Sequence, residues 1–409
     1  MVTIDKALDI IYSTVTKKSR HIIPIEQSIG SISAKSYKAF FDLPRFDNSA
    51  MDGYAIRLVD SGAEVRVREI TYAGDTPKEI LQDGEAIKIM TGAPIPNGCE
   101  SIVPIEDIVH SENGIILPKN IKPNAMIRYR GEDIKSGESF LDANEKITAY
   151  SLALLSSQGI THIEVYRKPK VVIFSTGEEL KAHYEKIEAH QLYNSNAPMF
   201  YARAKELGCD VSYISSSGDT LDELKFSIKE AIDADLILTS GGVSVGDKDF
   251  TIDAFVELGM EVLFSKVSIK PGKPTTFGKM RDCFVINLPG NPLAAMVNFE
   301  MFVKPIILKL SGTNSFYHPL ITTKMRADHR VKAGRYTAIL GEWNGDSFAP
   351  IKNQKPGMVS PLEKADGMIV TTPKIDSLNR NQEVKMIPIK LDLQSSIKED
   401  FFIYNGNGV

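Results

Sequence analysis

The chain has 409 residues, of which 43% are hydrophobic and 24% are charged, and its formal net charge is -4. This length exceeds what one hydrophobic core usually holds, so we expect a folded protein of two or more domains. The small negative charge and the lack of any apolar run of about 18 residues argue against a nucleic-acid or membrane partner, and the cytoplasm is the expected compartment.

The first expected element is a helix. Apolar residues recur at spacings of three and four between Ile4 and Val15, and Thr3 directly precedes them. A threonine at this place is a plausible N-cap, because its hydroxyl can accept a hydrogen bond from a free backbone N–H group. We therefore expect roughly the first 40 residues to be helical.

A small all-β domain is expected next. Between residues 48 and 139, glycine, proline, asparagine and aspartate separate short β-rich runs, which are Glu64–Tyr72, Ala86–Met90 and Gly114–Leu117. Such runs between turn residues are typical of short strands.

A second helix is expected after the β domain. The segment ITAYSLALLSSQGI, residues 147–160, has the length of a helix and ends near Gly159, a favourable residue just after a helix. We interpret the β domain, residues 48–139, as an insertion into a partly helical N-terminal linker domain, whose two halves are residues 1–47 and 140–168.

From residue 169 onward, strand, glycine loop and helix follow one another repeatedly. The repeats are VVIFSTGEEL, DLILTSGGVSVGDKDF and CFVINLPGNPLAAMVNFEMF. Buried strands alternating with helices predict a doubly wound parallel sheet, here assigned to residues 169–315. A last β-rich stretch, residues 316–409, predicts a barrel-like domain, so the expected fold class is α/β multidomain.

The glycine loops are the first candidate site. Ligands of open parallel sheets bind outside the carboxyl ends of the strands, where these loops lie. TSGGVSVGD exposes backbone N–H groups to an anion, and LPGNP places Asn291 as an N-cap and Pro292 at the first helical position, leaving amides free towards the sheet edge. A tight turn or an ordinary helix start explains each loop equally simply. The residues expected to bind substrate here are Thr176, Gly241, Gly242, Ser244 and Gly290.

Charged residues gather in the same region. The acids are Glu179, Asp219, Asp247 and Asp249, and KVSIKPGKP carries Lys266, Lys270 and Lys273. Carboxylates beside a phosphate-type cradle suit Mg²⁺, which prefers oxygen ligands and substrate phosphates. The lysines suit a highly charged anionic substrate, although lysines around a Pro-Gly turn are also common on a plain solvated surface.

A second group of motifs lies in the β domain. It comprises DNSAMDGYA (47–55), TGAP (91–94) and RYRGEDI (128–134). Asp52 alone is typical of a turn, and Arg128, Arg130 and Asp133 are compatible with a surface ion pair. We expect a shared cleft, because three such loops in one domain are unusual as independent turns.

Cysteine and histidine chemistry is disfavoured. Cys99, Cys209 and Cys283 are too far apart for a CxxC motif, and the seven histidines form no HExxH-type pair. The cysteines are interpreted as small core residues. The chemistry is expected to depend on carboxylates, lysines, arginines and backbone amides.

Taken together, the motifs resemble one known family. The motifs DLPRFDNSAMDGYA, TGAPIP, RYRGEDI, FSTGEEL, SGGVSVGDKDF, IKPGKP, LPGNP and ADGMIV, in this order between about residues 3 and 373, are similar to those of molybdopterin molybdenumtransferases, including the corresponding domain of gephyrin. The resemblance implies a homodimer in which the doubly wound domain of one subunit faces the β domain of the other. It also implies adenylylated molybdopterin and molybdate as substrates, Mg²⁺ as metal, and AMP and the molybdenum cofactor as products.

The resemblance also implies site residues. Carried onto matching positions, it places in the cleft Asp52, Asp133, Glu179, Asp219 and Asp249, together with Thr91, Arg128, Lys266 and Lys270, with Pro289 and Pro292 shaping a pocket for the oxyanion. Our hypothesis is that Mg²⁺, held by Asp249, Glu179 and Asp219, polarises the pyrophosphate, while the lysines offset developing charge.

Some positions depart from the family pattern. Glu178 stands where aspartate is common, Cys99-Glu100 replaces a more usual Ala-Asp, and KPGMVSP (355–361) matches the family's serine-containing loop poorly, which leaves the contribution of Ser360 open. The alternative functions are molybdopterin adenylyltransferase and a non-catalytic scaffold module. Further partners implied by the resemblance are the adenylyltransferase itself and proteins that mature molybdoenzymes.

Overall fold

The computed structural model describes residues 1–76, 80–175, 180–215, 221–241, 251–391 and 398. The chain divides into two compact units. Unit 1 comprises Met1–His21, Gly30–Ala34 and Glu164–Val409, and unit 2 comprises Ile22–Ile29 and Lys35–Ile163. The chain changes unit within β1 (Arg20–Pro24) and β12 (His162–Tyr166). The finer division into four domains stays a prediction.

Helix α1 (Ile4–Thr14) begins as the sequence indicates. Thr3 is its N-cap and accepts a hydrogen bond from the Lys6 N–H group at 3.3 Å. The helix ends at Thr14, so the expectation of helix over the first 40 residues is wrong beyond that point. The sequence RHIIP explains the change, because its β-branched residues favour a strand and Pro24 cannot donate a helical hydrogen bond.

Unit 1 contains a six-stranded sheet with the order β16-β13-β17-β21-β20-β18. The first four strands in this order run parallel, as predicted for a doubly wound sheet. Strand β20 pairs antiparallel with β21, and β18 pairs antiparallel with β20. The bounds are β13 (Lys170–Ser175), β16 (Asp210–Ser215), β17 (Leu236–Ser240), β18 (Glu261–Ser265), β20 (Thr276–Met280) and β21 (Cys283–Leu288).

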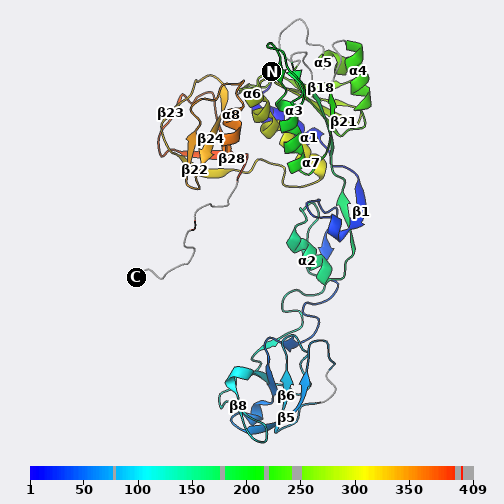
Figure 1. The fold of residues 1–409 in the computed structure, drawn as a ribbon, viewed down its shortest axis with the longest axis vertical. Coiled ribbons are helices and arrows are strands. Elements are labelled where there is room, and N and C mark those ends of the chain that lie inside the picture. The colour runs from blue at the N-terminus through cyan, green and yellow to red at the C-terminus, as the bar shows by residue number, and fades with distance from the viewer. Residues whose placement is uncertain (77–79, 176–179, 216–220, 242–250, 392–397, 399–409) are drawn as a thin grey trace. The chain divides into compact units, whose positions relative to one another are not determined.

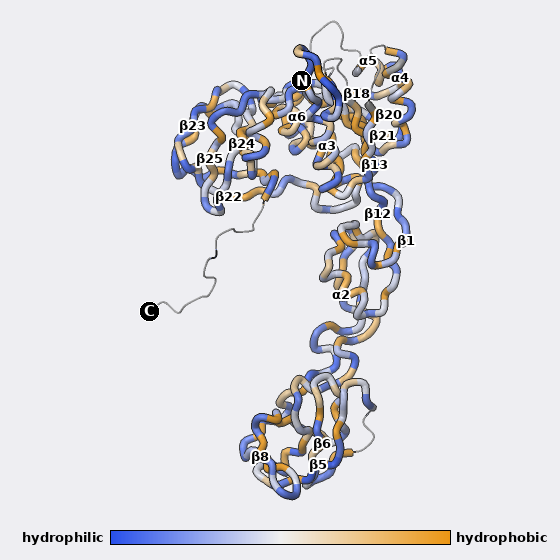
Figure 2. The backbone as a smooth tube through the Cα atoms, viewed as in Figure 1, coloured by the Kyte–Doolittle hydropathy of each residue, from blue (hydrophilic) through white to orange (hydrophobic). Residues whose placement is uncertain are grey.

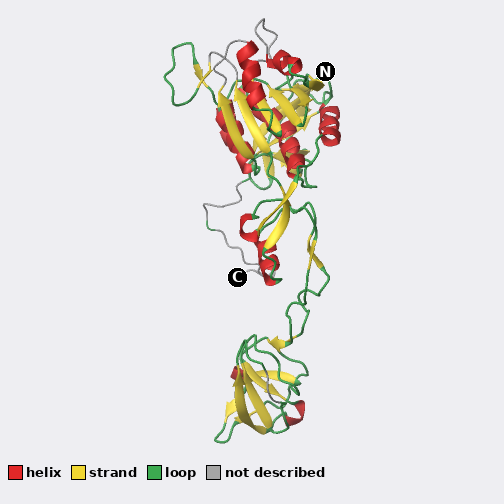
Figure 3. Ribbon diagram, turned by 90° about the vertical axis from the view of Figure 1, so that its right-hand side faces the viewer, coloured by secondary structure: helices red, strands yellow, loops and turns green. Residues whose placement is uncertain are grey.

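Helices cover both faces of this sheet (Figure 3). Successive strand residues point to opposite faces, and the two faces accordingly belong to separate cores. Ile173 and Leu238 pack in the core that includes α1 and α6, whereas Val172 and Ile237 pack in the other core. The hydrophobic strands appear in orange around β13 and β21 in Figure 2. The helices of this domain are α3 (Asn196–Glu206), α4 (Leu221–Glu230), α5 (Thr251–Glu257), α6 (Pro292–Asn298) and α7 (Lys304–Ser311). A π-helical turn at Phe299–Val303 lies between α6 and α7. The domain also has a short pair of strands, β14 (Leu180–Lys181) and β15 (Leu192–Tyr193).

The C-terminal β-rich stretch forms a closed five-stranded barrel, as the sequence predicts. Its order is β24-β25-β22-β28-β26, and β26 pairs back onto β24 to close it. The bounds are β22 (Ile321–Met325), β24 (Tyr336–Trp343), β25 (Ser347–Pro350), β26 (Gly367–Thr371) and β28 (Glu383–Pro388), accompanied by β23 (His329–Arg330), β27 (Ser377–Leu378) and helix α8 (Ser360–Lys364). Figure 1 shows these elements in yellow to red.

Unit 2 contains a six-stranded β subdomain with the order β7-β4-β6-β5-β9-β8. Its strands are β4 (Gly53–Ile56), β5 (Glu64–Thr71), β6 (Glu85–Ile89), β7 (Ser101–Pro104), β8 (Val109–His110) and β9 (Ile115–Ile116), with single 3-10 turns at Leu58–Asp60 and Ile105–Asp107. The remainder comprises a 3-10 turn at Ile25–Gln27, β2 (Tyr37–Lys38), β3 (Asn48–Ser49), β10 (Ile127–Arg128), β11 (Ser139–Leu141) and α2 (Ala149–Ser157).

Helix α2 confirms the helix expected within residues 147–160. Thr148 and Ser151 form a capping box at its start, and Gly159 takes a left-handed φ of 68° just after its end. Across the described residues, no helix has both the length and the apolar character that a membrane crossing requires.

Candidate functional site

The three central strands of the doubly wound sheet end side by side. Ser175 of β13 is in register with Ser240 of β17, which is in register with Leu288 of β21. The glycine loops that follow therefore start from one edge of the sheet, where open α/β sheets bind ligands. Of the residues predicted in these loops, Thr176, Glu178, Glu179, Asp219, Gly242, Ser244, Asp247 and Asp249 lie outside the described residues.

A buried asparagine that sequence reasoning missed ties two of these loops together. Asn196, at the start of α3, donates from Nδ2 to the Ser240 hydroxyl at 2.7 Å and to the Gly290 carbonyl at 2.8 Å. The chains also approach closely, since a Cβ on Gly290 would lie 3.6 Å from Cα of Gly241. A distance of 3.6 Å is an ordinary van der Waals contact, so the two loops lie against each other without a clash, and glycine at position 241 suits its left-handed φ of 92°.

The start of α6 differs from the expectation. Pro292 is its first residue and Asn291 its N-cap, as predicted, but the Asn291 side chain makes no capping hydrogen bond. The N–H groups of Leu293 and Ala294 both donate to the carbonyl of Pro356, at 3.0 and 3.4 Å. The prediction that these amides are free towards the sheet edge is wrong, because the KPGM turn of the barrel domain occupies them.

The lysine loop, residues 266–273, connects the sheet to the barrel. Lys266, Lys270 and Lys273 are all exposed. Lys270 belongs to β19 (Ile269–Lys270), which pairs in parallel with β24 of the barrel. Lys266 has a left-handed φ of 62°, which residues with a side chain adopt rarely. Its carbonyl accepts the Val2 N–H group at 2.9 Å.

In unit 2, two predicted site residues contact each other directly. Oδ1 of Asp52 accepts hydrogen bonds from the backbone N–H of Thr91 at 2.7 Å and from its hydroxyl at 2.8 Å. These two bonds, the backbone one first, hold the pKa of Asp52 below its usual range. The carboxylate is exposed and stays charged at neutral pH.

The three β-domain motifs come together, as expected from their recurrence in one domain. Strand β10 pairs with β3, which sets Arg128 opposite Asn48. The TGAP motif contacts the same segment, since the Gly92 N–H donates to Ser49 and the Ser49 N–H donates to Ala93. Residues 47–55, 91–94 and 126–128 are thus parts of one backbone network, which we name the loop cluster.

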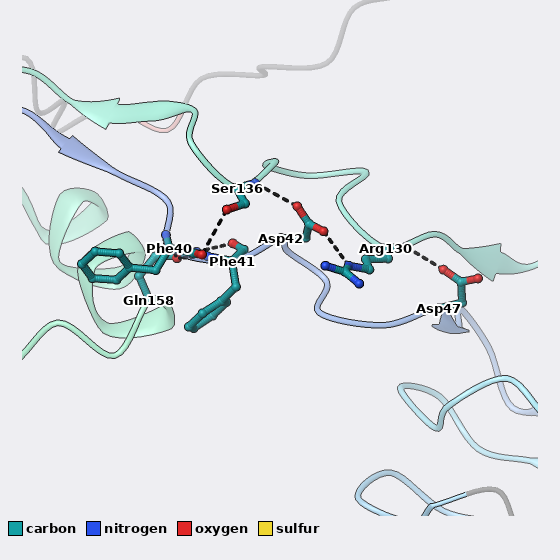
Figure 4. Close-up of polar contacts among 7 residues, drawn as sticks. All are labelled: Phe40, Phe41, Asp42, Asp47, Arg130, Ser136 and Gln158. Atoms are coloured by element: carbon teal, nitrogen blue, oxygen red, sulfur yellow. Dashed lines mark hydrogen bonds and ion pairs between the residues drawn. The ribbon is translucent and has the colours of Figure 1, made fainter.

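Arg130 has a different partner from the one considered in the sequence. Instead of Asp133, its Nε contacts Asp42 at 2.5 Å, and its backbone N–H donates to Asp47 at 2.8 Å. Ser136 donates its N–H to Asp42 at 2.8 Å, and this bond, followed by that of Arg130, lowers the pKa of Asp42. Figure 4 shows these contacts together with Gln158, which bonds the backbone of the same connecting segment.

The predicted site residues therefore fall into two sets. Asp52, Thr91, Arg128 and Asp133 belong to unit 2. Unit 1 holds Gly241, Lys266, Lys270, Pro289, Gly290 and Pro292 among its described residues.

Burial keeps the three cysteine thiols in their neutral form. Burial raises the pKa of Cys99 to about 11 and those of Cys209 and Cys283 to about 12, so these thiols stay protonated at neutral pH. Cys209 and Cys283 are core residues, as interpreted from the sequence. Within the described ranges, no three His, Cys, Asp or Glu residues are grouped as a metal site would require.

Fold and loop placement define a class, namely multidomain α/β proteins with glycine-rich loops at the carboxyl edge of a doubly wound sheet. Over 361 residues the chain is 33% identical to the molybdopterin molybdenumtransferase of Staphylococcus aureus (strain COL), and the matched region covers 85% of this chain and 86% of that protein. The chain belongs to the molybdopterin molybdenumtransferase family and is a transferase of molybdenum-cofactor biosynthesis.

Other comparisons agree with this assignment. The family model for the MoeA N-terminal region (domain I and II) matches residues 2–159, and that for a probable molybdopterin binding domain matches residues 172–309. A molybdopterin molybdenumtransferase of Staphylococcus epidermidis (strain ATCC 12228 / FDA PCI 1200) is 34% identical over the same shares of each chain. The crystal structure of a molybdopterin biosynthesis MoeA protein from Pyrococcus horikosii has a TM-score of 0.82 and 29% identity, covering 95% of this chain and 99% of that one.

Proposed function

We propose that this transferase places molybdate onto the dithiolene of adenylylated molybdopterin and releases AMP. The phosphoanhydride bond between AMP and the pterin phosphate breaks, and an oxygen atom from water or molybdate ends on phosphorus. Molybdenum binds both dithiolene sulfurs, and the oxo ligand that they displace leaves as water with the two thiol protons or is the oxygen transferred to phosphorus. Because those sulfurs belong to the substrate, the protein needs no thiolate of its own. The protonated thiols of Cys99, Cys209 and Cys283 are compatible with this.

The lysine loop is the observation that carries the proposal. Lys266 and Lys270 are exposed on a loop fixed by pairing with Val2, Thr275 and β24, so two ammonium groups are presented from a defined backbone. Fixed positive charges stabilise a negative charge that develops on phosphate or molybdate oxygens without a reorganisation cost at the moment of reaction. The backbone of Gly241 and Gly290, tied by Asn196, is proposed to line the same substrate site with Pro289 and Pro292.

Unit 2 supplies the second part of the proposed site. The Asp52–Thr91 pair and Arg128 are held by the loop cluster, and Asp133 follows in the RYRGEDI motif. The relatives are named for molybdopterin and molybdenum transfer, which supports an anionic pterin substrate that these residues would orient. We propose a homodimer in which unit 2 of one subunit completes the site of unit 1 of the other.

Magnesium is proposed as the metal. The donor chemistry fits, because Glu179, Asp219 and Asp249 offer carboxylate oxygens, which are the ligands Mg²⁺ prefers, together with oxygens of substrate phosphates. Bound there, the ion would supply positive charge at the pyrophosphate. We further propose a cytoplasmic location, where the adenylyltransferase that makes the substrate and the proteins that receive the cofactor are the expected partners.

The test is a reconstituted reaction with the full chain. Adenylylated molybdopterin, molybdate and Mg²⁺ should give AMP, and omission of molybdate should leave the molybdenum cofactor unformed. Asp249→Ala should lower the rate by about 100- to 1000-fold, the usual effect of removing one preorganised electrostatic group. Asp253→Ala, which removes an exposed aspartate in the first turn of α5, is the matched control and should retain activity. ATP consumption in place of AMP release, or full activity of Asp249→Ala, would contradict the proposal.

A further inference from the structure

One buried side chain outside the predicted site holds the lysine loop. Asn298 is the last residue of α6, fully buried, in a helix whose other residues are all apolar. Its Nδ2 donates to the carbonyls of Ala294 at 2.7 Å and Pro271 at 3.4 Å, and its Oδ1 accepts the Thr275 hydroxyl at 2.9 Å. A single carboxamide therefore joins α6 to both sides of the Pro-Gly turn in the loop.

The turn is built around this amide. Gly272 has a φ of 110°, and a Cβ at this position would lie 1.7 Å from Nδ2 of Asn298. The Thr275 hydroxyl also lies 3.0 Å from the Gly272 carbonyl. Glycine is required here for two reasons, the backbone conformation and the space that the amide occupies.

The lysines are linked to the turn through the backbone. The Lys266 N–H donates to the Thr275 carbonyl at 3.0 Å, and the Val267 N–H donates to the Lys273 carbonyl at 2.9 Å. Lys266 needs such support, because its left-handed conformation is unfavourable for a residue with a Cβ and persists only where the surroundings fix it. Loss of the Asn298 contacts would leave Thr275, and through it Lys266, free to adopt other conformations.

We propose that Asn298 is a positioning residue for the transferase reaction, whose amide fixes the 271–275 turn and thereby aims Lys266 and Lys270. The inference rests on the proposed role of these lysines in offsetting substrate charge. The carboxamide suits the task, since it supplies a donor and an acceptor without bringing a charge into a fully buried position. Asn298 touches no reacting group and acts only through the loop.

The test compares Asn298→Leu, which keeps the number and branching of the side-chain heavy atoms but removes the polar atoms, with a matched control, Thr323→Val. Thr323 is also buried, and its hydroxyl donates to the Asp346 carbonyl and accepts from the Trp343 ring N–H, so the valine variant also loses two hydrogen bonds. It lies in the barrel strand β22, outside the lysine loop. Both variants should unfold at lower temperature than the parent. Only Asn298→Leu should accelerate hydrogen exchange at the Lys266 and Val267 amides, measured in the full chain below both unfolding temperatures.

Activity gives the second readout. A misplaced catalytic group commonly costs about 100-fold, so Asn298→Leu should lower kcat/KM for AMP release by roughly 10- to 100-fold, whereas Thr323→Val should not. Unchanged exchange at Lys266 and Val267, or equal activity losses in the leucine variant and the Thr323 control, would overturn the positioning role. Full activity in Lys270→Ala would instead contradict the proposed function of the lysines, and the exchange result would still decide whether Asn298 fixes the turn.

Discussion

Single hydrogen bonds set the electrostatic state of the clearest candidate residue, Asp52. An exposed aspartate ordinarily has a pKa near 3.9, and the two bonds from Thr91 stabilise its charged form. The carboxylate thus remains an acceptor with one oxygen already used by Thr91. This arrangement fixes the orientation of the carboxylate more firmly than an isolated turn aspartate would allow.

Thr91→Ala tests this pairing. The variant loses the hydroxyl donor but keeps the backbone N–H, so the pKa of Asp52 should rise yet stay below its ordinary value. Because the folded pKa is depressed, the pair contributes stability above the unfolded pKa of about 3.9 and loses it as pH falls through the folded value. Carbon-13 titration of the Asp52 carboxyl in both proteins measures the change. An unshifted titration in Thr91→Ala would show that the hydroxyl does not stabilise the charge.

At the scale of elements, one buried glutamine holds the segment that connects the β subdomain to the α2 region. Gln158 accepts the N–H groups of Phe40 and Phe41 at 2.8 and 3.2 Å and donates to the Phe41 carbonyl at 3.2 Å. Asp42 and Ser136 continue the network along the neighbouring segment (Figure 4). Backbone groups here have no regular strand partner, so a side chain replaces the ladder.

Gln158→Leu should therefore destabilise unit 2. It leaves the N–H groups of Phe40 and Phe41 without their acceptor, at a cost of about 1–3 kcal/mol for each group that water cannot reach. Urea unfolding, with hydrogen exchange at Phe40 and Phe41, measures the effect. Ser157→Ala, which alters the exposed neighbouring residue, is the control and should change the free energy of unfolding by less than about 0.5 kcal/mol. Equal stability of the two variants would contradict this role.

A buried charge links α3 to the π-helical turn. Glu300 is fully buried, and its Oε1 lies 2.8 Å from Nε and 2.7 Å from Nη2 of Arg203, while Lys304 lies 3.5 Å from Oε2. Glu300→Ala should lower the free energy of unfolding by about 3–5 kcal/mol, because Arg203 then lacks its buried counter-charge. Glu206→Ala, which removes an exposed partner of the same arginine, should cost less than about 1 kcal/mol. Fluorescence of the single tryptophan, Trp343, reports unfolding of this unit, and similar losses in the two variants would argue against the buried pair.

The elements that were predicted correctly are those whose signals lie in neighbouring residues of the sequence. The cap at Thr3, the helix before Gly159 and the strand-loop-helix repeats follow from neighbouring residues. The antiparallel strands β18 and β20 did not follow, since their pairing depends on partners in other parts of the chain. The same limit applies to the site: KVSIKPGKP is visible as a motif, but the amide that holds it comes from Asn298, a lone polar residue with no periodic signal.

The C-terminal barrel shows how distant segments decide local chemistry. LPGNP has every local feature of a helix start with free amides, and only the fold reveals that Pro356 accepts two of them. The KPGM turn therefore contributes to the surroundings of Pro292. The Pro356 carbonyl accepts the N–H groups of Leu293 and Ala294, so these two amides are not available to bind an anion.

At the scale of the whole molecule, the proposed site draws on two compact units of the chain. Asp52, Thr91 and Arg128 belong to unit 2, and Lys266 and Lys270 belong to unit 1. A site shared between subunits of a homodimer makes a distinctive prediction, because each defective chain can supply the part that the other lacks.

Subunit exchange between Asp52→Asn and Lys270→Ala provides the test. Each variant alone should be nearly inactive, since every site then lacks one group. After exchange about half of the dimers are mixed, and each mixed dimer has one site with both native residues, so activity should recover to about a quarter of the parent level. Native mass spectrometry measures the mixed dimers, and each variant mixed with itself is the control. If both residues served one site within a single chain, no mixture could restore an intact site, and activity that stays at the level of the separate variants would sink the shared-site proposal.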